Sequence, residues 1–516
     1  MITDLIGWRA SLTPKRPALF WKDRWYSYAE LNERAQKLAA CLHQQGIKKD
    51  DRIAILALNH IAHLDLVLAA PKLGFIYTPF NYRLSSAEQK QLAAEIKPAL
   101  LLHDEKHCAL AEATGCRRLP LENYETWLYE ESAAPSTSAG GNSSFSMTPA
   151  PEPATPMLNG DDIHMILFTG GSTGLPKGAL IPYRQVFFNA VNTAIAWGIT
   201  ENDCTIQATP AFHAALNVLT TPLLFLGGRV IWAETFDPGE YLKLAQAHQA
   251  TVLFMVPTMF QMLTEHSEFK NTDLSQVRFA ISGGAACPPA MREPFAARGI
   301  GFKQGYGMTE CGVNCFAISL DEAKQYPGAV GRPMPTLQAV IRTPDGAPVK
   351  PGEIGELTLS GPVVCAGYFN KPDETAESFR DGWLWTGDLA RQDERGLYFI
   401  CGRRKEMYIS GGENIYPAEI ETALLQCAGV AECAVIGIPH PRWGETGLAA
   451  VSLRPDVRLN AESLRALLKP RLAGYKLPGE FLFLDTLPKT GAGKVNKPEI
   501  RRIYEAGQIV KQARLA

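Results

Sequence analysis

The sequence lacks a long uninterrupted apolar run. A helix that crosses a membrane needs roughly 20 consecutive apolar residues, and the candidate stretch Val218–Trp232 is broken by Pro222 and Gly227. The first ten residues contain Asp4 and have neither the basic region nor the long apolar region of a signal peptide. We therefore expect a cytoplasmic protein with no transmembrane segment.

Clustered cysteines and an excess of one charge are also missing. The 11 cysteines are scattered without a Cys-x-x-Cys pair, which argues against both a disulfide framework and a structural metal site. Only Cys311 and Cys315 are one helical turn apart, and two thiols alone make a poor metal site. The net charge of −2 gives no electrostatic footprint for nucleic acid, so no nucleic-acid partner is expected.

The chain is long enough for more than one domain. At 516 residues it exceeds the roughly 250–300 residues at which a single hydrophobic core stops growing. Short apolar runs alternate with helical patterns, which is typical of an α/β fold with a buried and mostly parallel sheet. The runs are Arg52–Leu58, Ala99–Leu102, Met165–Phe168, Thr251–Val256 and Arg278–Ile281. In addition, Ser27 and Glu30 form a capping-box pattern that predicts a helix ending at Gly46.

The texture of the chain changes in two places. Residues 133–157 are rich in Pro, Ser, Thr, Ala and Gly, which predicts a flexible surface loop, with a domain linker as the alternative. From about Gly355 the pattern is more β-like, with candidate strands at Gly355–Leu359, Gly367–Phe369 and Leu397–Ile400. We expect a large domain over 1–402, including a β-rich subdomain, and a small α+β domain over 403–516.

A glycine-rich loop follows the strand Met165–Phe168. It runs from Thr169 to Gly178 and contains three hydroxyl side chains and Lys177. Glycine lets backbone amides converge on an anion, and lysine adds a positive charge, so the loop is suited to a polyphosphate. It is not a Walker loop, because Pro176 precedes Lys177 and disfavours a helix there. A plain glycine-rich turn is the alternative.

A second cluster spans Gln304–Glu310. Tyr306 stands between two glycines and can stack on a flat base, while Glu310 can coordinate a hard cation that holds phosphate oxygens. A buried tyrosine in a turn is the alternative.

Together with several further segments, these two clusters resemble the adenylate-forming superfamily of acyl-CoA synthetases, peptide-synthetase adenylation domains and beetle luciferases. The resemblance covers nearly the whole chain. The further segments are Gly352–Leu357, Gly367-Tyr368, Gly382–Asp388, Gly402-Arg403 with Lys405, Ser410–Pro417 and Leu487–Lys494.

The resemblance implies roles in ATP and Mg²⁺ binding for residues of both clusters. Those implied for the β and γ phosphates are Thr169, Ser172, Thr173, Gly174 and Lys177, with Thr173 also near Mg²⁺. Those implied for the adenine side are Gly284, Ala285, Gly305, Tyr306, Gly307 and Met308. Thr309 and Glu310 would serve the α-phosphate and Mg²⁺, and Asp388 and Arg403 the ribose.

The resemblance also implies a mobile C-terminal lid. Lys494 would bridge the acid and the α-phosphate, Lys405 would be the hinge, and Gly411 and Gly412 would belong to the face used for thioester formation. His213, after Phe212, would be a gate or a contact on the acid side.

The implied activity is conversion of a carboxylic acid and ATP to an acyl adenylate, and then transfer to coenzyme A. A candidate acyl pocket is apolar and lined by small residues, which would admit an acyl chain or an aromatic ring: Ala211, Ala214, Ala215, Asn217, Val313 and Cys315. A fatty acid of medium or long chain is the first expectation, and an aryl or arylpropenoic acid is the second. Three alternatives stay open: a carrier protein as the acceptor, a non-catalytic ligand-binding protein, and a phosphotransfer enzyme that releases ADP. An oligomer is compatible with the sequence.

Overall fold

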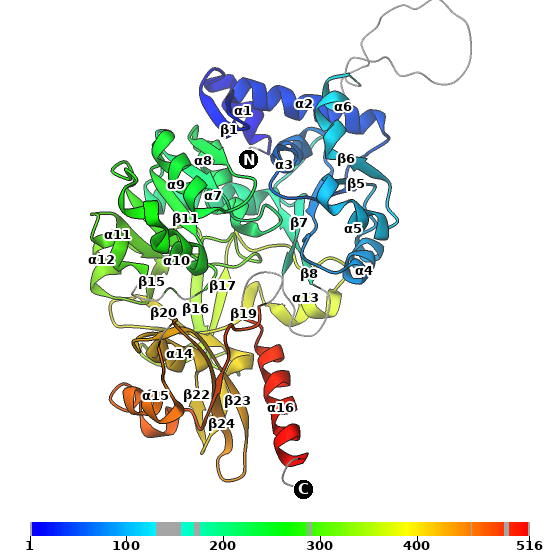
Figure 1. The fold of residues 1–516 in the computed structure, drawn as a ribbon. Coiled ribbons are helices and arrows are strands. Elements are labelled where there is room, and N and C mark those ends of the chain that lie inside the picture. The colour runs from blue at the N-terminus through cyan, green and yellow to red at the C-terminus, as the bar shows by residue number, and fades with distance from the viewer. Residues whose placement is uncertain are drawn as a thin grey trace, which may run out of the picture.

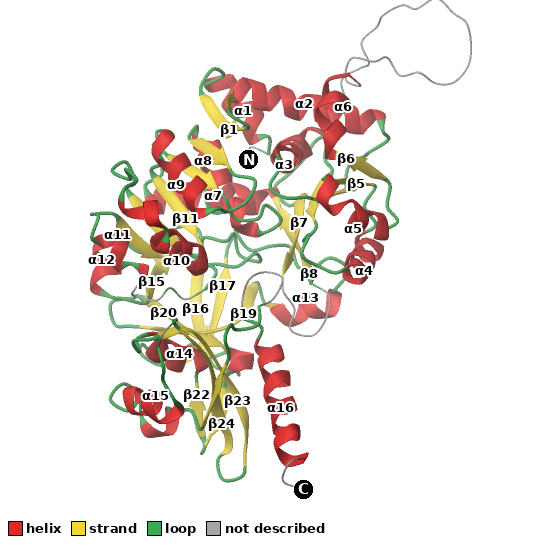
Figure 2. Cartoon of the chain, in the orientation of Figure 1, coloured by secondary structure: helices red, strands yellow, loops and turns green. Residues whose placement is uncertain are grey.

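The computed structural model describes residues 3–130, 156–169, 176–285, 287, 291–455, 457–489 and 495–513, and the structural statements below concern those residues. Sheets flanked by helices form the larger, N-terminal part of the molecule (Figure 1). A smaller unit of strands and helices, which includes the C-terminal helix, lies at the opposite end (Figure 2).

The first sheet has six strands in the order β6-β5-β3-β4-β7-β8. Its neighbouring strands are parallel except for β7 and β8. The strands are β3 (Arg52–Leu56), β4 (Ile76–Pro79), β5 (Leu100–His103), β6 (Arg118–Pro120), β7 (Ile163–Thr169) and β8 (Lys177–Pro182). The strands β4 and β5 are buried along their whole length, as expected of a parallel sheet covered on both faces.

Two smaller sheets repeat this parallel design. One has the order β2-β1-β10-β9 and the other β11-β12-β13, and only β1 and β2 are antiparallel. The strands are β1 (Pro17–Trp21), β2 (Arg24–Ser27), β9 (Cys204–Gln207), β10 (Arg229–Trp232), β11 (Val252–Met255), β12 (Phe279–Ser282) and β13 (Gly301–Gln304).

Helices cover these sheets, and the ion pairs of the buried Arg34 join three of them. Arg34 of α2 donates to Asp65 of α3 over 2.7 Å and to Glu125 of α6 over 2.7 Å. The main helices are α1 (Leu5–Leu12), α2 (Tyr28–Gln44), α3 (Ile61–Leu73), α4 (Ser86–Ile96), α5 (Cys108–Ala113), α6 (Tyr124–Glu130), α7 (Tyr183–Trp197), α8 (Thr220–Leu226), α9 (Pro238–Ala247), α10 (Pro257–Glu265), α11 (Glu293–Ala296) and α12 (Leu320–Gln325).

An antiparallel sheet of seven strands follows, in the order β14-β15-β20-β19-β17-β16 with β18 beside β19. Its strands are β14 (Phe316–Ala317), β15 (Ala329–Pro333), β16 (Gln338–Arg342), β17 (Ile354–Ser360), β18 (Phe379–Arg380), β19 (Trp383–Gln392) and β20 (Tyr398–Arg403), with α13 (Pro372–Ser378) beside them.

The C-terminal unit has a five-stranded sheet, ordered β22-β21-β24-β23 with β25 beside β24. Its elements are β21 (Tyr408–Ser410), β22 (Glu413–Ile415), α14 (Pro417–Leu425), β23 (Val430–His440), β24 (Gly444–Leu453), α15 (Ala461–Leu468), β25 (Glu480–Phe483) and α16 (Lys497–Ala513).

The predicted α/β class is confirmed, together with a β-rich part and a smaller C-terminal unit. The capping box of Ser27 and Glu30 is formed at the start of α2. The predicted strand Gly367–Phe369 is wrong, because Gly367 adopts φ 116° and the segment is a loop with one isolated bridge, between Tyr368 and Ala179. Of the predicted flexible loop 133–157, only Pro156 and Met157 lie inside the described residues.

Candidate active site

The carboxylate of Asp388 bonds to two side chains, on the side of the site where ribose binding is expected. Asp388 lies on β19 opposite Arg403 of β20, and the Arg403 Nε atom is 2.6 Å from Asp388 Oδ1. The Tyr306 hydroxyl donates to Asp388 Oδ2 over 2.6 Å. Burial, followed by the negative charge of Asp388, raises the pKa of Tyr306, so this phenol remains a donor. Burial alone would lower the pKa of Arg403, but the charge of Asp388 together with those of Tyr306, Glu310 and Glu406 outweighs it, and the pKa is raised.

The loop that carries Tyr306 is shaped by close backbone contacts. It leaves β13 where the Gly305 amide donates to the Ser282 carbonyl over 2.8 Å. A Cβ atom on Gly307 would meet the Val313 carbonyl oxygen at 1.8 Å, so only glycine fits there. Gly284, which follows β12, is exposed and has φ 81°, a conformation that also favours glycine.

The phosphate side contains both ends of the glycine-rich loop. Thr169 ends β7 and Lys177 begins β8, and the two residues are paired in the antiparallel ladder. The turn between them, including Ser172, Thr173 and Gly174, lies outside the described residues. The Lys177 ammonium lies 5.1 Å from the centre of the Tyr368 ring.

Glu310 provides a buried carboxylate next to these groups. It is 6% exposed, and its Oε1 atom accepts a 3.0 Å hydrogen bond from the Tyr368 hydroxyl. Burial raises the pKa of Glu310, and the hydrogen bonds of Tyr368 and Thr169 and the charge of Arg403 offset only part of that rise. The interaction with Arg403 connects the phosphate side to the ribose side.

The donor set fits Mg²⁺ held together with a nucleotide. Among the described residues no three His, Cys, Asp or Glu side chains form a group that could hold a metal alone. Mg²⁺ usually binds through one or two carboxylates plus substrate phosphates rather than in a complete protein cage, and Glu310 can supply one such carboxylate. The hydroxyl of Thr309 is adjacent in sequence, and the backbone carbonyl of Thr309 accepts from the Gln185 amide over 2.9 Å.

The segment expected to contain the hinge is bonded to both parts of the molecule. On one side Arg403 pairs with Asp388, and the Arg404 Nε atom lies 3.3 Å from Glu356 Oε2 of β17. On the other side Glu406 pairs with Lys497 of α16 over 2.5 Å. Lys405 stands between these attachments, and burial, followed by repulsion from Arg403, lowers its pKa.

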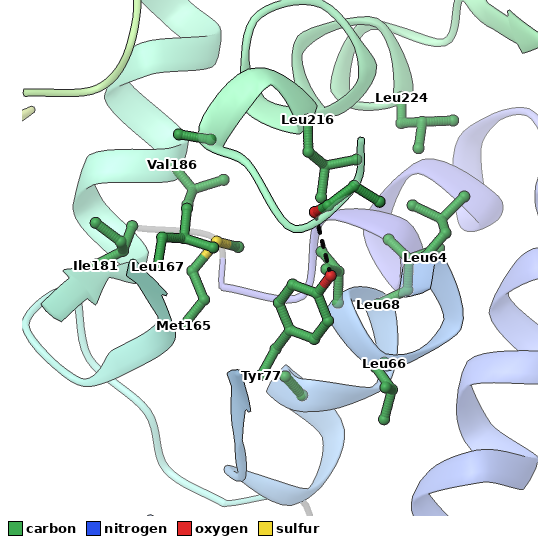
Figure 3. Close-up of a cluster of buried hydrophobic side chains, with 14 of the residues drawn as sticks. Leu64, Leu66, Leu68, Tyr77, Met165, Leu167, Ile181, Val186, Leu216 and Leu224 are labelled. Atoms are coloured by element: carbon green, nitrogen blue, oxygen red, sulfur yellow. Dashed lines mark hydrogen bonds between the residues drawn. The ribbon is translucent and has the colours of Figure 1, made fainter. Parts of the chain in front are cut away.

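Neutral hydrogen bonds hold the chain before the Phe212-His213 pair. The Asn59 side chain accepts from the Ala211 amide over 2.7 Å and donates to the carbonyls of Thr209 and Ala233 over 3.0 Å each. The Tyr77 hydroxyl donates to the Ala211 carbonyl over 3.4 Å. Figure 3 shows Tyr77 among buried apolar side chains, with a dashed line for a hydrogen bond of its hydroxyl.

Phe212 is buried and His213 is half-buried at the end of this loop. Their ring centroids are 4.3 Å apart, and the rings of Phe212 and Tyr82 are perpendicular with centroids 5.0 Å apart. The small residues expected to line an acyl pocket include Ala211 and Ala214, which are buried. Asn217, from the same set, is also buried and accepts from Thr221 over 3.1 Å, so this wall is partly polar.

Gly411 and Gly412 lie on the C-terminal unit, in the turn between β21 and β22. Both have positive φ, 60° and 89°, as a two-residue hairpin turn requires. The Gly411 amide donates to the Trp443 carbonyl over 2.9 Å, so the turn lies beside the β23–β24 connection.

The structure thus brings Thr169, Lys177, Tyr306, Glu310, Asp388 and Arg403 into one connected network. Motif reasoning did not assign roles to Tyr368, Asn59 or Glu356. Tyr368 stood within a motif of the resemblance, so its place was visible, but its partners were not. Lys494 lies outside the described residues.

Comparison with known proteins gives a consistent family match. A family model described as AMP-binding enzyme matches residues 6–369, and one described as AMP-binding enzyme C-terminal domain matches residues 419–494. A feruloyl-CoA synthase from Amycolatopsis sp is 37% identical over 497 residues, covering 96% of this chain and 97% of that protein. A long-chain-fatty-acid–CoA ligase from Mycobacterium tuberculosis is 31% identical over 510 residues, covering 97% and 99%.

A solved structure matches over the same length. The o-succinylbenzoate–CoA synthetase from Bacillus subtilis, in complex with ATP and magnesium, superposes with a TM-score of 0.84 at 29% identity, covering 95% of this chain and 98% of that one.

Among the described residues there is no helix long and apolar enough to cross a membrane.

Replacement of Gly307 by alanine tests the shape of the Tyr306 loop. The new Cβ would collide with the Val313 carbonyl, so the loop must move, and a shift of about 1 Å can cost roughly 10²-fold in rate. We expect Gly307→Ala to lower the rate of ATP-dependent adenylation by about that factor, measured as acid-dependent pyrophosphate release. Gly474→Ala, where a Cβ meets nothing within 4 Å, is the control. Equal rates in the two variants would contradict this account of the loop.

Proposed function

The chain belongs to the AMP-binding enzyme family and is an acid–CoA ligase, and on that premise we propose that it activates an aromatic carboxylic acid. The oxygen of the acid attacks the α-phosphorus of ATP, pyrophosphate leaves, and the sulfur of coenzyme A then displaces AMP from the acyl adenylate. The observation that supports this chemistry best is the network in which Lys177, Glu310 and the Asp388–Arg403 pair meet.

Each residue of the candidate site is assigned a role in binding ATP and Mg²⁺ or in the reaction. Lys177 and Thr169 bind the β and γ phosphates with the glycine-rich turn, Tyr306 and Gly284 bind the adenine, and Asp388 accepts from the ribose hydroxyls with Arg403 beside it. Glu310 and Thr309 serve Mg²⁺ and the α-phosphate, and Mg²⁺ when bound neutralises charge on phosphate oxygens. Lys494 stabilises the negative charge that concentrates where the two anions react.

The choice of acid rests on the relatives. The sequence favoured a fatty acid over an aryl or arylpropenoic acid, and relatives of both kinds exist. We now place the aromatic acid first, because the feruloyl-CoA synthase shares 37% of its residues with this chain and the fatty-acid ligase 31%. The fatty acid, which the sequence placed first, becomes the second candidate, since the alanines near Phe212 can accept a chain.

The bonding of the linker supports Lys405 as the pivot of a mobile C-terminal domain. Residues before Lys405 are attached to the large domain and Glu406 is attached to the small one. A rotation that exchanges the Lys494 face for the Gly411-Gly412 face would let one cleft serve both half-reactions.

The 11 cysteines are all free thiols, which agrees with a reducing cytoplasm as the compartment.

The substrate proposal is tested with a panel of acids. Purified enzyme is given ATP, Mg²⁺ and one acid at a time, and pyrophosphate and AMP are measured with and without coenzyme A. We expect kcat/KM for ferulic or another arylpropenoic acid to exceed that for dodecanoic acid by at least about tenfold, a difference of about 1.4 kcal/mol in transition-state binding. If kcat/KM is instead higher for dodecanoic acid, the substrate is a fatty acid. Release of ADP, or no cleavage of ATP with any acid, would refute the proposed reaction, and a carrier protein tested as the acceptor distinguishes it from coenzyme A.

Replacement of Lys494 by alanine separates the two half-reactions. We expect adenylation to slow by roughly two to three orders of magnitude, as for the loss of one electrostatic stabiliser, while thioester formation from synthetic acyl adenylate changes far less. Lys489→Ala, which removes a lysine paired with Glu432 in the preceding segment, is the control for loss of charge. Equal losses of rate in both half-reactions would contradict the role assigned to Lys494.

Replacement of Lys405 by proline tests the pivot. Proline fixes φ near −65°, so the backbone can no longer rotate freely, whereas Lys405→Ala keeps that freedom. We expect Lys405→Pro to retain one half-reaction and to lose the other, and therefore to lower overall turnover, while Lys405→Ala keeps both. Unchanged turnover in the proline variant would show that the pivot lies elsewhere.

A further inference from the structure

Tyr368 contacts the two oppositely charged residues of the phosphate side. Its hydroxyl donates to Glu310 Oε1 over 3.0 Å, and its ring faces the Lys177 ammonium at 5.1 Å. The same hydroxyl also interacts with the side chain of Ser378. Tyr368 is 9% exposed, so both contacts are made in a largely dry environment.

The backbone around Tyr368 is fixed to the strand that begins with Lys177. Tyr368 forms an isolated bridge with Ala179, and the Phe369 amide donates to the Gly178 carbonyl over 2.8 Å. The Tyr368 amide donates to Thr375 Oγ1 over 3.0 Å. The ring therefore has one defined position relative to Lys177, and it does not depend on the conformation of a free loop.

Charge explains why a neutral ring in this position is useful. A lysine and a carboxylate in one buried site attract each other strongly, because the low dielectric constant reduces screening. An ion pair between Lys177 and Glu310 would occupy the groups that must bind phosphate and metal. Within the described ranges neither side chain forms an ion pair. The phenol satisfies one oxygen of Glu310 without cancelling its charge, and the π face attracts the ammonium without neutralising it.

We propose that Tyr368 is a positioning residue that holds Glu310 for Mg²⁺ and Lys177 for phosphate by keeping them from pairing with each other. The inference rests on the proposed roles of these two residues. Loss of the hydroxyl alone weakens the orientation of the carboxylate, whereas loss of the ring also frees the lysine to pair with it.

Two substitutions separate these effects. Tyr368→Phe keeps the ring under Lys177 and removes the hydrogen bond to Glu310, and Tyr368→Leu removes both. The matched control is Tyr398→Phe, because Tyr398 is 4% exposed, lies in the same β-rich part, and donates through its hydroxyl to the Ala339 carbonyl over 2.9 Å. The variant Tyr398→Phe thus loses a buried tyrosine hydrogen bond that is not directed at Glu310.

The measurement is ATP binding by titration calorimetry, without acid or coenzyme A, across a series of MgCl₂ concentrations and in EDTA. For Tyr368→Phe we expect the Mg²⁺ concentration that gives half of the maximal ATP affinity to rise about tenfold, as for the loss of a hydrogen bond to a charged group, with affinity in EDTA within about twofold of wild type. For Tyr368→Leu we expect the affinity in EDTA to fall as well. Tyr398→Phe should match wild type in both measurements.

The outcomes distinguish this inference from the proposed function. If wild type binds ATP in a Mg²⁺-dependent way and Tyr368→Phe behaves like Tyr398→Phe, the positioning role is wrong and the proposed function stands. If wild type shows no Mg²⁺-dependent ATP binding, the proposed function fails and this inference fails with it. Melting temperatures of the two phenylalanine variants that agree with each other show that a difference in binding does not come from misfolding.

Discussion

The network of candidate site residues depends on one buried carboxylate. Asp388 is 5% exposed and is paired with donors from two other segments, Arg403 at the end of β20 and Tyr306 in the loop after β13. A buried carboxylate is stable only when its oxygens are bonded, so the positions of these segments are fixed together. Because Arg403 ends the last strand before the C-terminal sheet, the same carboxylate also fixes the start of the segment that joins the two sheets.

Two kinds of interaction hold the candidate site. The residues around Asp388 and Glu310 are held by charges in a buried environment, where an electrostatic contact is stronger than in water. The chain before Phe212 is held by neutral groups, since Asn59 and Tyr77 bond to the backbone around Ala211. Burial lowers the pKa of His63, the partner of Tyr77, to about 3, so that network stays neutral at physiological pH. Shape and neutral hydrogen bonds therefore hold the chain that leads to Phe212 and His213.

Paired charges also hold the segment that joins the seven-stranded sheet to the C-terminal sheet. The Arg404 side chain is 53% exposed, but its partner Glu356 is only 5% exposed. Glu406 is 34% exposed, and its partner Lys497 is 19% exposed. Each pair thus has one side chain in water and one that is largely buried, so these contacts are screened less than pairs between two fully exposed side chains.

The sequence by itself determined the α/β class, most strand positions and the order of the motifs, because apolar periodicity and glycine-rich loops are local properties. It also placed Lys177 and Glu310 in clusters that suit a nucleotide, while Asp388 and Arg403 were implied by the family resemblance. Only the tertiary structure decided which side chains bond to each other. Tyr306 meets Asp388 from 82 positions away and Tyr368 meets Glu310 from 58 positions away, and the apparent strand at Gly367 is a loop because its backbone turns to φ 116°. Contacts of that kind follow from the packing of whole sheets, which no local pattern of residues encodes.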